Sequence, residues 1–162
     1  MIETPIGEAL HRLLHAYKRA MREAYRDIGI ELAIAHIRTL KLIHHFQAST
    51  GAPCTAQAIA IRLERDKAQI ARLVKDLLSA ELIEKQSNPD DGRSQLLTVT
   101  HQGETMLERI RMAERRASQR MAAGLSNEEL TTFIRLGDTM TANLGEPDGR
   151  RQSSKSVPQE KL

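Results

Sequence analysis

Apolar residues recur every three or four positions along the first third of the chain, which is the spacing of one face of an α-helix. The spacing predicts a long amphipathic helix over 6–28 and a second helix over about 31–47. The segment "STGAP" (49–53) then ends the pattern with residues typical of turns. The apolar positions are Ile6, Leu10, Leu13, Leu14, Tyr17, Met21, Ala24 and Ile28 in the first helix, and Ala33, Ile37, Leu40 and Ile43 in the second.

Two more helices are predicted in quick succession after this break. Thr55 is a typical N-cap residue for a short third helix. In the next segment, 66–82, Asp66 and Gln69 have the spacing of a capping box. The apolar sides of the two helices comprise Ile59 and Leu63, and then Ile70, Leu73, Val74 and Leu77.

The opposite side of the 66–82 helix carries Ala68, Arg72, Lys75 and Ser79. Small residues near its start and long basic ones after them suit a helix that approaches a phosphate backbone closely while Gln69 and Arg72 reach base edges. A plain solvated surface explains the same pattern, because basic amphipathic helices are common. The helix alone therefore leaves both interpretations open.

A β-hairpin is predicted directly after this helix. The segments "LIEKQS" (82–87) and "SQLLTVT" (94–100) read as two strands, and "NPDDGR" (88–93) joins them with residues that favour chain reversal. A helix-turn-helix followed by a hairpin is the element order of a winged helix.

The hairpin tip carries a cation that suits a DNA groove. The narrow minor groove has a negative potential that attracts an arginine such as Arg93. Asp90 and Asp91 would repel phosphates, so we expect at least one of them to pair with an arginine and to hold its guanidinium in place. An ordinary solvated hairpin is the alternative.

Two amphipathic helices are predicted at the C-terminal end, over 101–124 and from Ser126 onward, where Glu129 completes a capping box. Together with the first helix they carry more apolar surface than a small winged domain covers, so we expect a homodimer. The apolar positions are Met106, Ile110, Ala113, Ala117 and Met121, and then Leu130, Phe133, Ile134, Met140 and Leu144.

Composition narrows the class of protein. The chain of 162 residues has a net charge of +3 and a pI of about 9.2, which favours a polyanionic partner. Residues 53–100 nevertheless hold seven Lys/Arg against seven Asp/Glu, so a DNA contact there depends on placement. No secretion signal or membrane-length apolar run is visible, and we expect a cytoplasmic protein without membrane contact.

Other functions find less support in the residues. No phosphate-binding glycine loop, nucleophile motif or paired acid suggests an enzyme, and no cofactor is expected. Cys54 is the single cysteine, so it excludes a disulfide within the chain, and inert packing is the expectation over oxidant sensing. The histidines on the predicted helices are expected on solvent-exposed faces, although a metal-sensing regulator stays an alternative. These histidines are His11 and His15 near Glu8, and His36, His44 and His45.

Residues 53–103 resemble the winged-helix core of MarR-family transcription regulators. The resemblance rests on the Asp91-x-Arg93 wing and on the strand-to-helix junction that contains Leu97 or Val99, Thr100 and Gly103. It extends over about 5–145, and the opening "IETPIGEALHRLLHAYKRAM" is similar to the SlyA branch. The chain departs from the family pattern at two positions, Glu81 for a helix-ending glycine and Lys85 for an arginine after the first wing strand.

The resemblance implies a mostly α fold with a small two- or three-stranded β-wing, in which a winged helix-turn-helix is flanked by long dimerisation helices. It assigns 1–30 to an N-terminal dimerisation helix, 31–100 to the DNA-binding domain and 101–145 to C-terminal dimerisation helices. The polar residues 146–162 are expected to form a disordered tail.

The implied function is a transcriptional regulator that binds a pseudo-palindromic operator in double-stranded DNA as a homodimer and is released by a small aromatic or anionic effector. The main rival is a helical dimeric interaction protein that binds no DNA. We expect DNA contacts from Thr55, Lys67, Ala68, Gln69, Arg72, Lys75, Asp91 and Arg93. Effector contacts are expected from Tyr17, Arg22, Tyr25 and His36.

Overall fold

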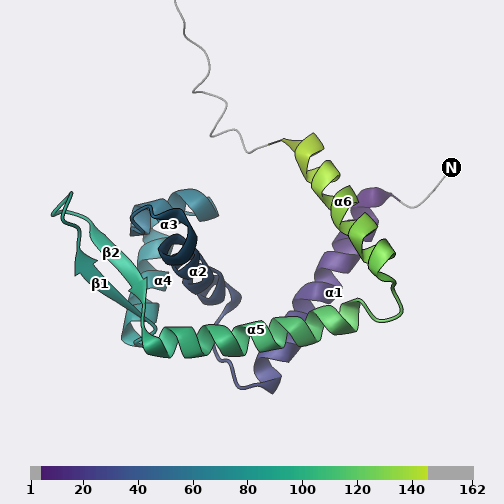
Figure 1. Ribbon diagram of the computed structural model, residues 1–162, viewed down its shortest axis with the longest axis horizontal. Coiled ribbons are helices and arrows are strands. Elements are labelled where there is room, and N and C mark those ends of the chain that lie inside the picture. Colours follow the sequence, from purple (N-terminus) through teal and green to yellow (C-terminus); the bar gives the residue numbers. More distant parts are fainter. Residues whose placement is uncertain (1–4, 146–162) are drawn as a thin grey trace, which may run out of the picture. The chain divides into compact units, whose positions relative to one another are not determined.

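The computed structural model describes residues 5–145, which form two compact units (Figure 1). The expected tail, 146–162, lies outside the described residues. The first unit extends to Met121 and the second begins at Ala122. The first unit contains α1 (Ile6–Asp27), α2 (Ile34–His45), a π-helical turn η1 (Phe46–Thr50), α3 (Ala56–Leu63), α4 (Lys67–Ser79), β1 (Ile83–Ser87), β2 (Gln95–Val99) and α5 (His101–Met121).

Helix α2 is shorter than the predicted second helix. Its N-cap, Ala33, has extended backbone with ψ 154°, so the helix begins at Ile34 and not near residue 31. Its C-terminal end widens into η1, which Gly51 ends in the left-handed conformation with φ 59°. A π-helical turn closes i→i+5 hydrogen bonds and is rare outside functional or strained sites.

The core of the first unit is built around α2. This helix packs against α3, α4, α5, η1 and β2. Ile37, Leu40 and Ile43 are almost fully buried on it, and the buried Thr39 hydroxyl donates to the Ala35 carbonyl at 2.8 Å. A buried hydroxyl that finds a partner within its own helix avoids the cost of an unpaired polar group. The largest buried residues facing α2 from its neighbours are Ile59, Ile70, Leu77, Leu107 and Ile110.

Helix α5 runs as one long helix from the base of the hairpin to α1 (Figure 1). The contact between α1 and α5 buries Met21 and Tyr25 on α1 and Ala113 and Ala117 on α5. The Tyr25 hydroxyl donates to Oε1 of Glu114 at 3.2 Å. Burial, followed by the neighbouring Glu114 carboxylate, raises the pKa of Tyr25 well above its ordinary value.

The two wing strands pair antiparallel, with Ile83 opposite Val99 and Ser87 opposite Gln95. The other edge of β2 has no strand among the described residues, and two local groups take its N–H donors. Leu97 N–H donates to the Cys54 carbonyl at 2.8 Å, and Val99 N–H donates to Oε1 of Gln47 at 3.0 Å. Gln47 belongs to η1, so the π-helical turn places a side chain where a third strand would lie.

The junction between β2 and α5 requires a glycine. A Cβ added to Gly103 would lie 2.1 Å from the Leu82 carbonyl oxygen and 2.5 Å from a methyl carbon of Val99. The Thr100 hydroxyl donates to the Glu81 carbonyl at 2.6 Å and accepts the Gly103 N–H at 3.1 Å. The threonine and glycine of the junction therefore tie the end of α4 to the start of α5.

The second unit is described over 122–145 and contains α6 (Asn127–Leu144). The predicted capping box is confirmed, because the Ser126 hydroxyl accepts the Glu129 N–H at 3.1 Å and the Glu129 carboxylate accepts the Ser126 N–H at 2.8 Å. No residue of α6 is buried. Among 5–145, no helix has the length and apolar content needed to cross a membrane.

Candidate nucleic-acid interface

Helix α4 separates its buried residues from its polar ones as the periodicity predicts. Ile70, Val74 and Leu77 are buried, and Leu73 is half-buried. The five helix residues expected to contact DNA are all exposed on the remaining surface, and they are Lys67, Ala68, Gln69, Arg72 and Lys75. The predicted Asp66–Gln69 capping box is wrong, because the Asp66 side chain accepts no cap hydrogen bond.

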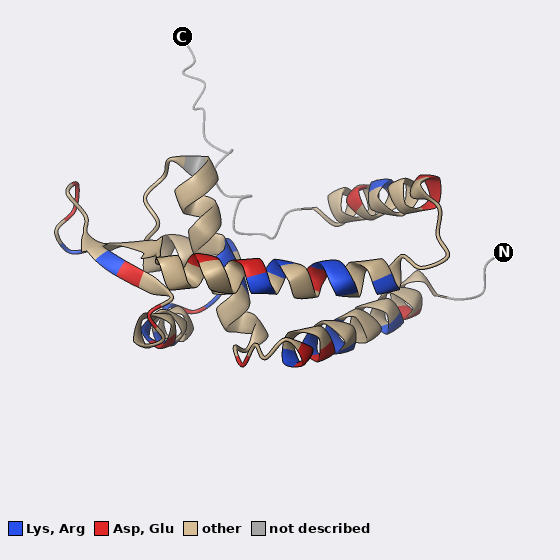
Figure 2. Cartoon of the chain, turned by 60° about the horizontal axis from the view of Figure 1, so that its bottom comes forward, with Lys and Arg blue, Asp and Glu red and all other residues tan. Residues whose placement is uncertain are grey.

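The hairpin tip is held by its own side chains. Asn88 is buried, its Nδ2 donates to Oγ of Ser94 at 2.9 Å, and its Oδ1 accepts the Asp90 N–H at 3.0 Å. The Asp91 carboxylate accepts the backbone N–H of Arg93 at 3.0 Å. These contacts fix the turn without using any part of the Arg93 guanidinium. Figure 2 shows the tip carrying both acidic and basic residues.

The expectation that an aspartate of the tip pairs with an arginine is wrong for this structure. Within residues 5–145, no ion pair involves Asp90, Asp91 or Arg93. The physical reason is local, since the Asp91 carboxylate closes an Asx-type turn onto its own backbone two residues on. The guanidinium of Arg93 is therefore exposed and available to a partner.

A groove of about 490 Å³ lies between α3, α4 and the wing. It brings Thr55 together with Asp91 and Arg93 of the hairpin tip, which are distant from Thr55 in sequence. Thr55 caps α3 as predicted, because its Oγ1 accepts the Ala58 N–H at 3.2 Å. The hydroxyl keeps its own hydrogen for an acceptor outside the helix, next to the positive end of the α3 dipole.

Lys85 is a candidate that the sequence analysis did not include. It was noted there only as a departure from an arginine, yet its side chain lines the same groove as Arg93. Strand alternation places Lys85 on the same face as the buried Ile83, yet Lys85 is exposed, so the strand pattern alone did not indicate its position. The groove thus carries two cations, Lys85 and Arg93, against one carboxylate, Asp91.

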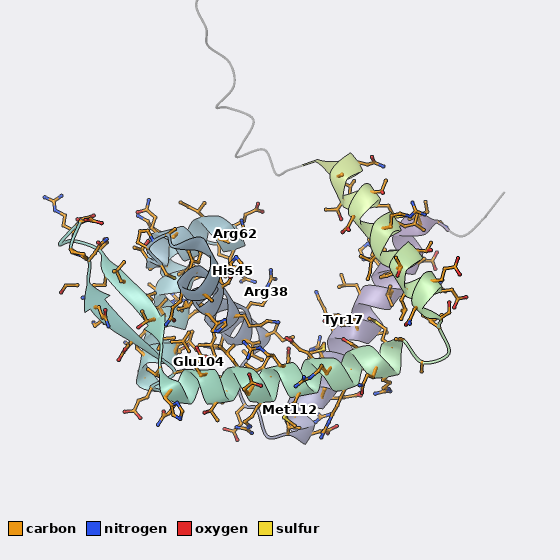
Figure 3. The ribbon with its side chains drawn as sticks, in the orientation of Figure 1. Tyr17, Arg38, His45, Arg62, Glu104 and Met112 are labelled. Atoms are coloured by element: carbon orange, nitrogen blue, oxygen red, sulfur yellow. The ribbon has the colours of Figure 1, made fainter. Side chains whose placement is uncertain are left out.

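The four expected effector residues lie in different environments. Tyr17 projects from α1 (Figure 3) and is half-exposed, lining a groove of about 190 Å³ between α1 and α5. Tyr25 is buried against Glu114, and Arg22 is exposed. His36 lies on α2 and contacts α4, with its Nε2 2.9 Å from Oδ2 of Asp76. The structure does not bring the four side chains into one cavity.

Cys54 is buried at the start of the α3 region, and its carbonyl accepts a hydrogen bond from β2. Burial raises the pKa of the Cys54 thiol to about 11. Because the thiolate is the reactive form, this environment favours packing over redox chemistry. Over residues 5–145, no three His, Cys, Asp or Glu side chains gather as a metal site would require.

The arrangement of α2, α3, α4 and the wing has a counterpart among known proteins. Residues 32–95 match the model of the MarR family. The matched segment runs from just before α2 to the first residue of β2, so it contains α4 and the hairpin tip. The helices α1, α5 and α6 lie outside it.

Solved structures extend the likeness to most of the chain. The S. aureus MepR–DNA complex matches with a TM-score of 0.71 at 18% identity, over 87% of this chain and 99% of that one. A MarR mutant from E. coli complexed with operator DNA matches with a TM-score of 0.68 at 21% identity, over 84% and 93%. A probable transcriptional regulator from Pseudomonas aeruginosa matches with a TM-score of 0.65 at 25% identity, over 86% and 99%.

These matches establish the fold. Over 5–145 it consists of six α-helices, one π-helical turn and a two-stranded antiparallel sheet, and it is the MarR winged-helix fold. The prediction of a mostly α chain with a small β-wing is confirmed. The sheet has two strands, the lower of the two expected numbers.

Proposed function

We propose that this protein is a sequence-specific DNA-binding transcriptional regulator of the MarR type, acting as a homodimer on a pseudo-palindromic operator. The observation that carries the proposal is the groove between α3, α4 and the wing, which is flanked by an exposed polar helix face and by the free guanidinium of Arg93. Two structures with this fold are complexes with DNA. A cytoplasmic location and the absence of catalysis accompany this proposal.

The proposed contacts divide by chemistry. The first turns of α4 enter the major groove, where Gln69 and Arg72 have the amide and guanidinium donors that read base edges. Lys67, Lys75 and Lys85 lie beside this face and bind phosphates, which positions the protein without reading sequence. Ala68 lets the helix approach closely, and Thr55 donates to a phosphate at the start of α3.

Arg93 is proposed to enter the minor groove, with Asp91 fixing the turn that presents it. The Arg93→Ala variant should lose at least tenfold in operator affinity while keeping its helical content. Fluorescence anisotropy with a duplex selected from genomic fragments measures the affinity, and circular dichroism measures the fold. Unchanged affinity would refute the role of the wing.

The proposed homodimer rests on apolar side chains that the chain leaves exposed. On α1 they occupy the first half of the helix, and on α6 they occur along its whole length. Contiguous exposed apolar surface of this kind marks interaction sites. The exposed residues are Ile6, Leu10, Leu13, Leu14 and Tyr17 on α1, and Phe133, Ile134, Leu136, Met140 and Leu144 on α6.

A two-fold dimer presents two α4 helices to successive turns of B-form DNA, roughly 34 Å apart. This requirement separates the proposal from a dimeric interaction protein that binds no DNA. A regulator shows an affinity for duplex that falls steeply with salt and a sequence preference that survives at physiological ionic strength. A dimer that lacks both properties would contradict the proposal.

Release by a small aromatic or anionic effector is part of the same proposal, as is membership of the SlyA-like branch suggested by the opening residues. Tyr17 offers an aromatic face in the α1–α5 groove, with Arg19 beside it and with Arg120, which pairs with Glu23 of the same groove at 3.4 Å. The groove of about 190 Å³ is smaller than the roughly 300 Å³ at which ligand pockets begin, so a second subunit would have to complete it.

An effector that releases DNA must bind the released state more tightly than the DNA-bound state. A hundredfold loss of operator affinity requires about 2.7 kcal/mol of differential binding. Aromatic carboxylates titrated into the operator complex test this expectation, with Tyr17→Ala as the variant that should lose the response. The same loss of affinity in both proteins would place the effector elsewhere.

A further inference from the structure

Asp76 is an acidic residue at an unfavourable place on α4. The helix ends at Ser79, so Asp76 lies in its last turn, where the helix dipole is negative and disfavours a carboxylate. The last turn contains no basic residue to offset it. The residue also lies beside the face that is proposed to approach phosphates. A carboxylate retained at such a position needs a compensating contact.

His36 provides that contact. Its Nε2 lies 2.9 Å from Oδ2 of Asp76 and joins α2 to α4 across 40 positions of sequence. Because an ionised carboxylate only accepts, the imidazole N–H donates. The His36 side chain is 20% exposed and the Asp76 side chain 62% exposed, so the histidine reaches the carboxylate from the inner side.

The histidine is held more firmly than its partner. It lies in the first turn of α2, next to the buried Ile37, and α2 is the helix around which the core is packed. Its Nδ1 is buried and has no hydrogen-bond partner among the described side chains and backbone. Nε2 is therefore the ring nitrogen that forms a hydrogen bond, and its partner is Asp76.

Arg72 lies one helical turn before Asp76 on α4, at the i,i+4 spacing at which oppositely charged side chains form an ion pair. The structure contains no such pair within residues 5–145, and Oδ2 of Asp76 contacts His36 instead. The guanidinium of Arg72 is left exposed. Arg72 and His36 are thus alternative partners for one carboxylate.

We propose that His36 is a positioning residue for DNA recognition, which holds Asp76 away from Arg72 and so keeps the Arg72 guanidinium free for the duplex. The inference rests on the proposed DNA-binding function and deepens it. It also gives His36 a role different from the effector contact expected of it. When His36 is removed, Asp76 turns to Arg72 and neutralises the charge that the helix presents to DNA.

The expected effect is modest and specific. An exposed i,i+4 pair favours the paired state by a factor of about two, so His36→Ala should weaken operator binding about threefold. Asp76→Ala alone should bind as tightly as the wild type or slightly more tightly. The double variant His36→Ala/Asp76→Ala should recover wild-type affinity, because no carboxylate remains to compete for Arg72. The full-length proteins are compared by anisotropy on one operator duplex.

Three further variants make the measurement selective. His36→Gln retains an N–H donor at similar reach and should keep wild-type affinity. His44→Ala removes a histidine of the same helix that pairs with Glu104 on α5 at 3.5 Å, and the affinity of this variant should not change. Arg72→Ala sets the limit of the effect, and because Arg72 is proposed to read a base edge, this variant should also relax the sequence preference at one base pair of the operator.

The double variant decides between positioning and general support of the fold. If it binds as weakly as His36→Ala, the histidine only stabilises α2, and the proposal is overturned. An unchanged affinity of His36→Ala in a protein whose Arg72→Ala variant binds weakly would also overturn it, while leaving the DNA-binding function intact. A wild-type protein that shows no preference for any duplex would instead refute the proposed function itself.

Discussion

The winged core and the outer helices use their apolar residues in opposite ways. In α2, α3 and α4 most of the large apolar side chains are buried or half-buried within the chain, with Leu40, Ile59 and Ile70 fully enclosed, and Ile61 is the most exposed exception. In α6 no residue is buried, and the first half of α1 is likewise exposed. The same helical periodicity therefore corresponds to a core-facing side in one region and, in the other, to an exposed side that is proposed to face a partner.

The contrast teaches that periodicity identifies an apolar face but not what covers it. The first unit can bury the apolar side chains of α2 because five other elements of the same unit pack against this helix. The helix α6 satisfies N–H groups at its N-terminal end by a capping box but leaves most of its large apolar side chains exposed. Its stability as an 18-residue helix is expected to depend on packing, as that of most helices in water does.

The largest expected effect comes from breaking the proposed partner-facing side. Ile134→Glu on α6 should weaken self-association by about 4 kcal/mol, because burial of such a side chain is worth about 2 kcal/mol and two-fold symmetry counts the change twice. Sedimentation equilibrium measures the dissociation constant. The exposed Arg135→Glu on the same helix is the matched control and should change association little. A dimer that tolerates Ile134→Glu would show that α6 is not part of its interface.

The next effect tests the winged core. Gly103→Ala places a methyl group 2.1 Å from the Leu82 carbonyl oxygen, so α5 must shift away from the end of α4. We expect a loss of about 3 kcal/mol in the free energy of unfolding, measured with urea. Gly7→Ala adds a Cβ with nothing within 4 Å and should not destabilise the protein. Equal stability of the two variants would contradict the tight junction.

The closed interior of the winged core also predicts the chemistry of Cys54. Its pKa of about 11 lies above the ordinary thiol value of 9.0, so at pH 8 the thiolate fraction should be about a hundredfold lower than for a free cysteine. Labelling with iodoacetamide should be slow in the folded protein and fast in urea. Burial also links the thiol to the free energy of unfolding. The contribution of Cys54 to this free energy should be constant below pH 9 and should fall as the pH rises toward 11. Rapid labelling of the native protein would mean that this interior is open.

The smallest effect concerns two glutamates in the left-handed region. Glu81 has φ 58° after α4, and Glu64 has φ 51° after α3. This conformation costs a residue with a side chain about 1 kcal/mol, which glycine does not incur. Glu81→Gly should therefore stabilise the core by up to about 1 kcal/mol, and Glu64→Gly by a similar amount. Thermal unfolding monitored by circular dichroism measures the shift, and a lower melting temperature would contradict the expected relief.

Much of the fold follows from local patterns that the structure bears out. Thr55 and Ser126 cap their helices, and the hairpin turns where Asn88-Pro89 and Asp91-Gly92 indicate it. Asp66 shows the limit of such patterns, because its side chain makes no cap bond although its spacing to Gln69 fits. A capping box needs the right side-chain rotamer as well as the right spacing. The rotamer depends on neighbours in the folded structure, which the sequence does not reveal.

The candidate site was less predictable than the fold. The exposed face of α4 follows from periodicity alone. The place of Arg93 at a turn follows from the turn-favouring residues around it. The pairing of His36 with Asp76 does not, because it joins residues 40 positions apart through the packing of α2 on α4. Lys85 shares this difficulty, since its place in the groove depends on how the wing folds back toward α3.

Gln47 has a consequence beyond the packing of the wing. A two-stranded sheet has two open edges, and an open edge can add a strand from another molecule. On the β2 side, Gln47 and the Cys54 carbonyl occupy the donors of Val99 and Leu97, and on the β1 side Glu84 and Lys85 place charges along the edge. The π-helical turn thus helps to guard the molecule against edge-to-edge aggregation, a hazard that an exposed two-stranded hairpin would otherwise carry.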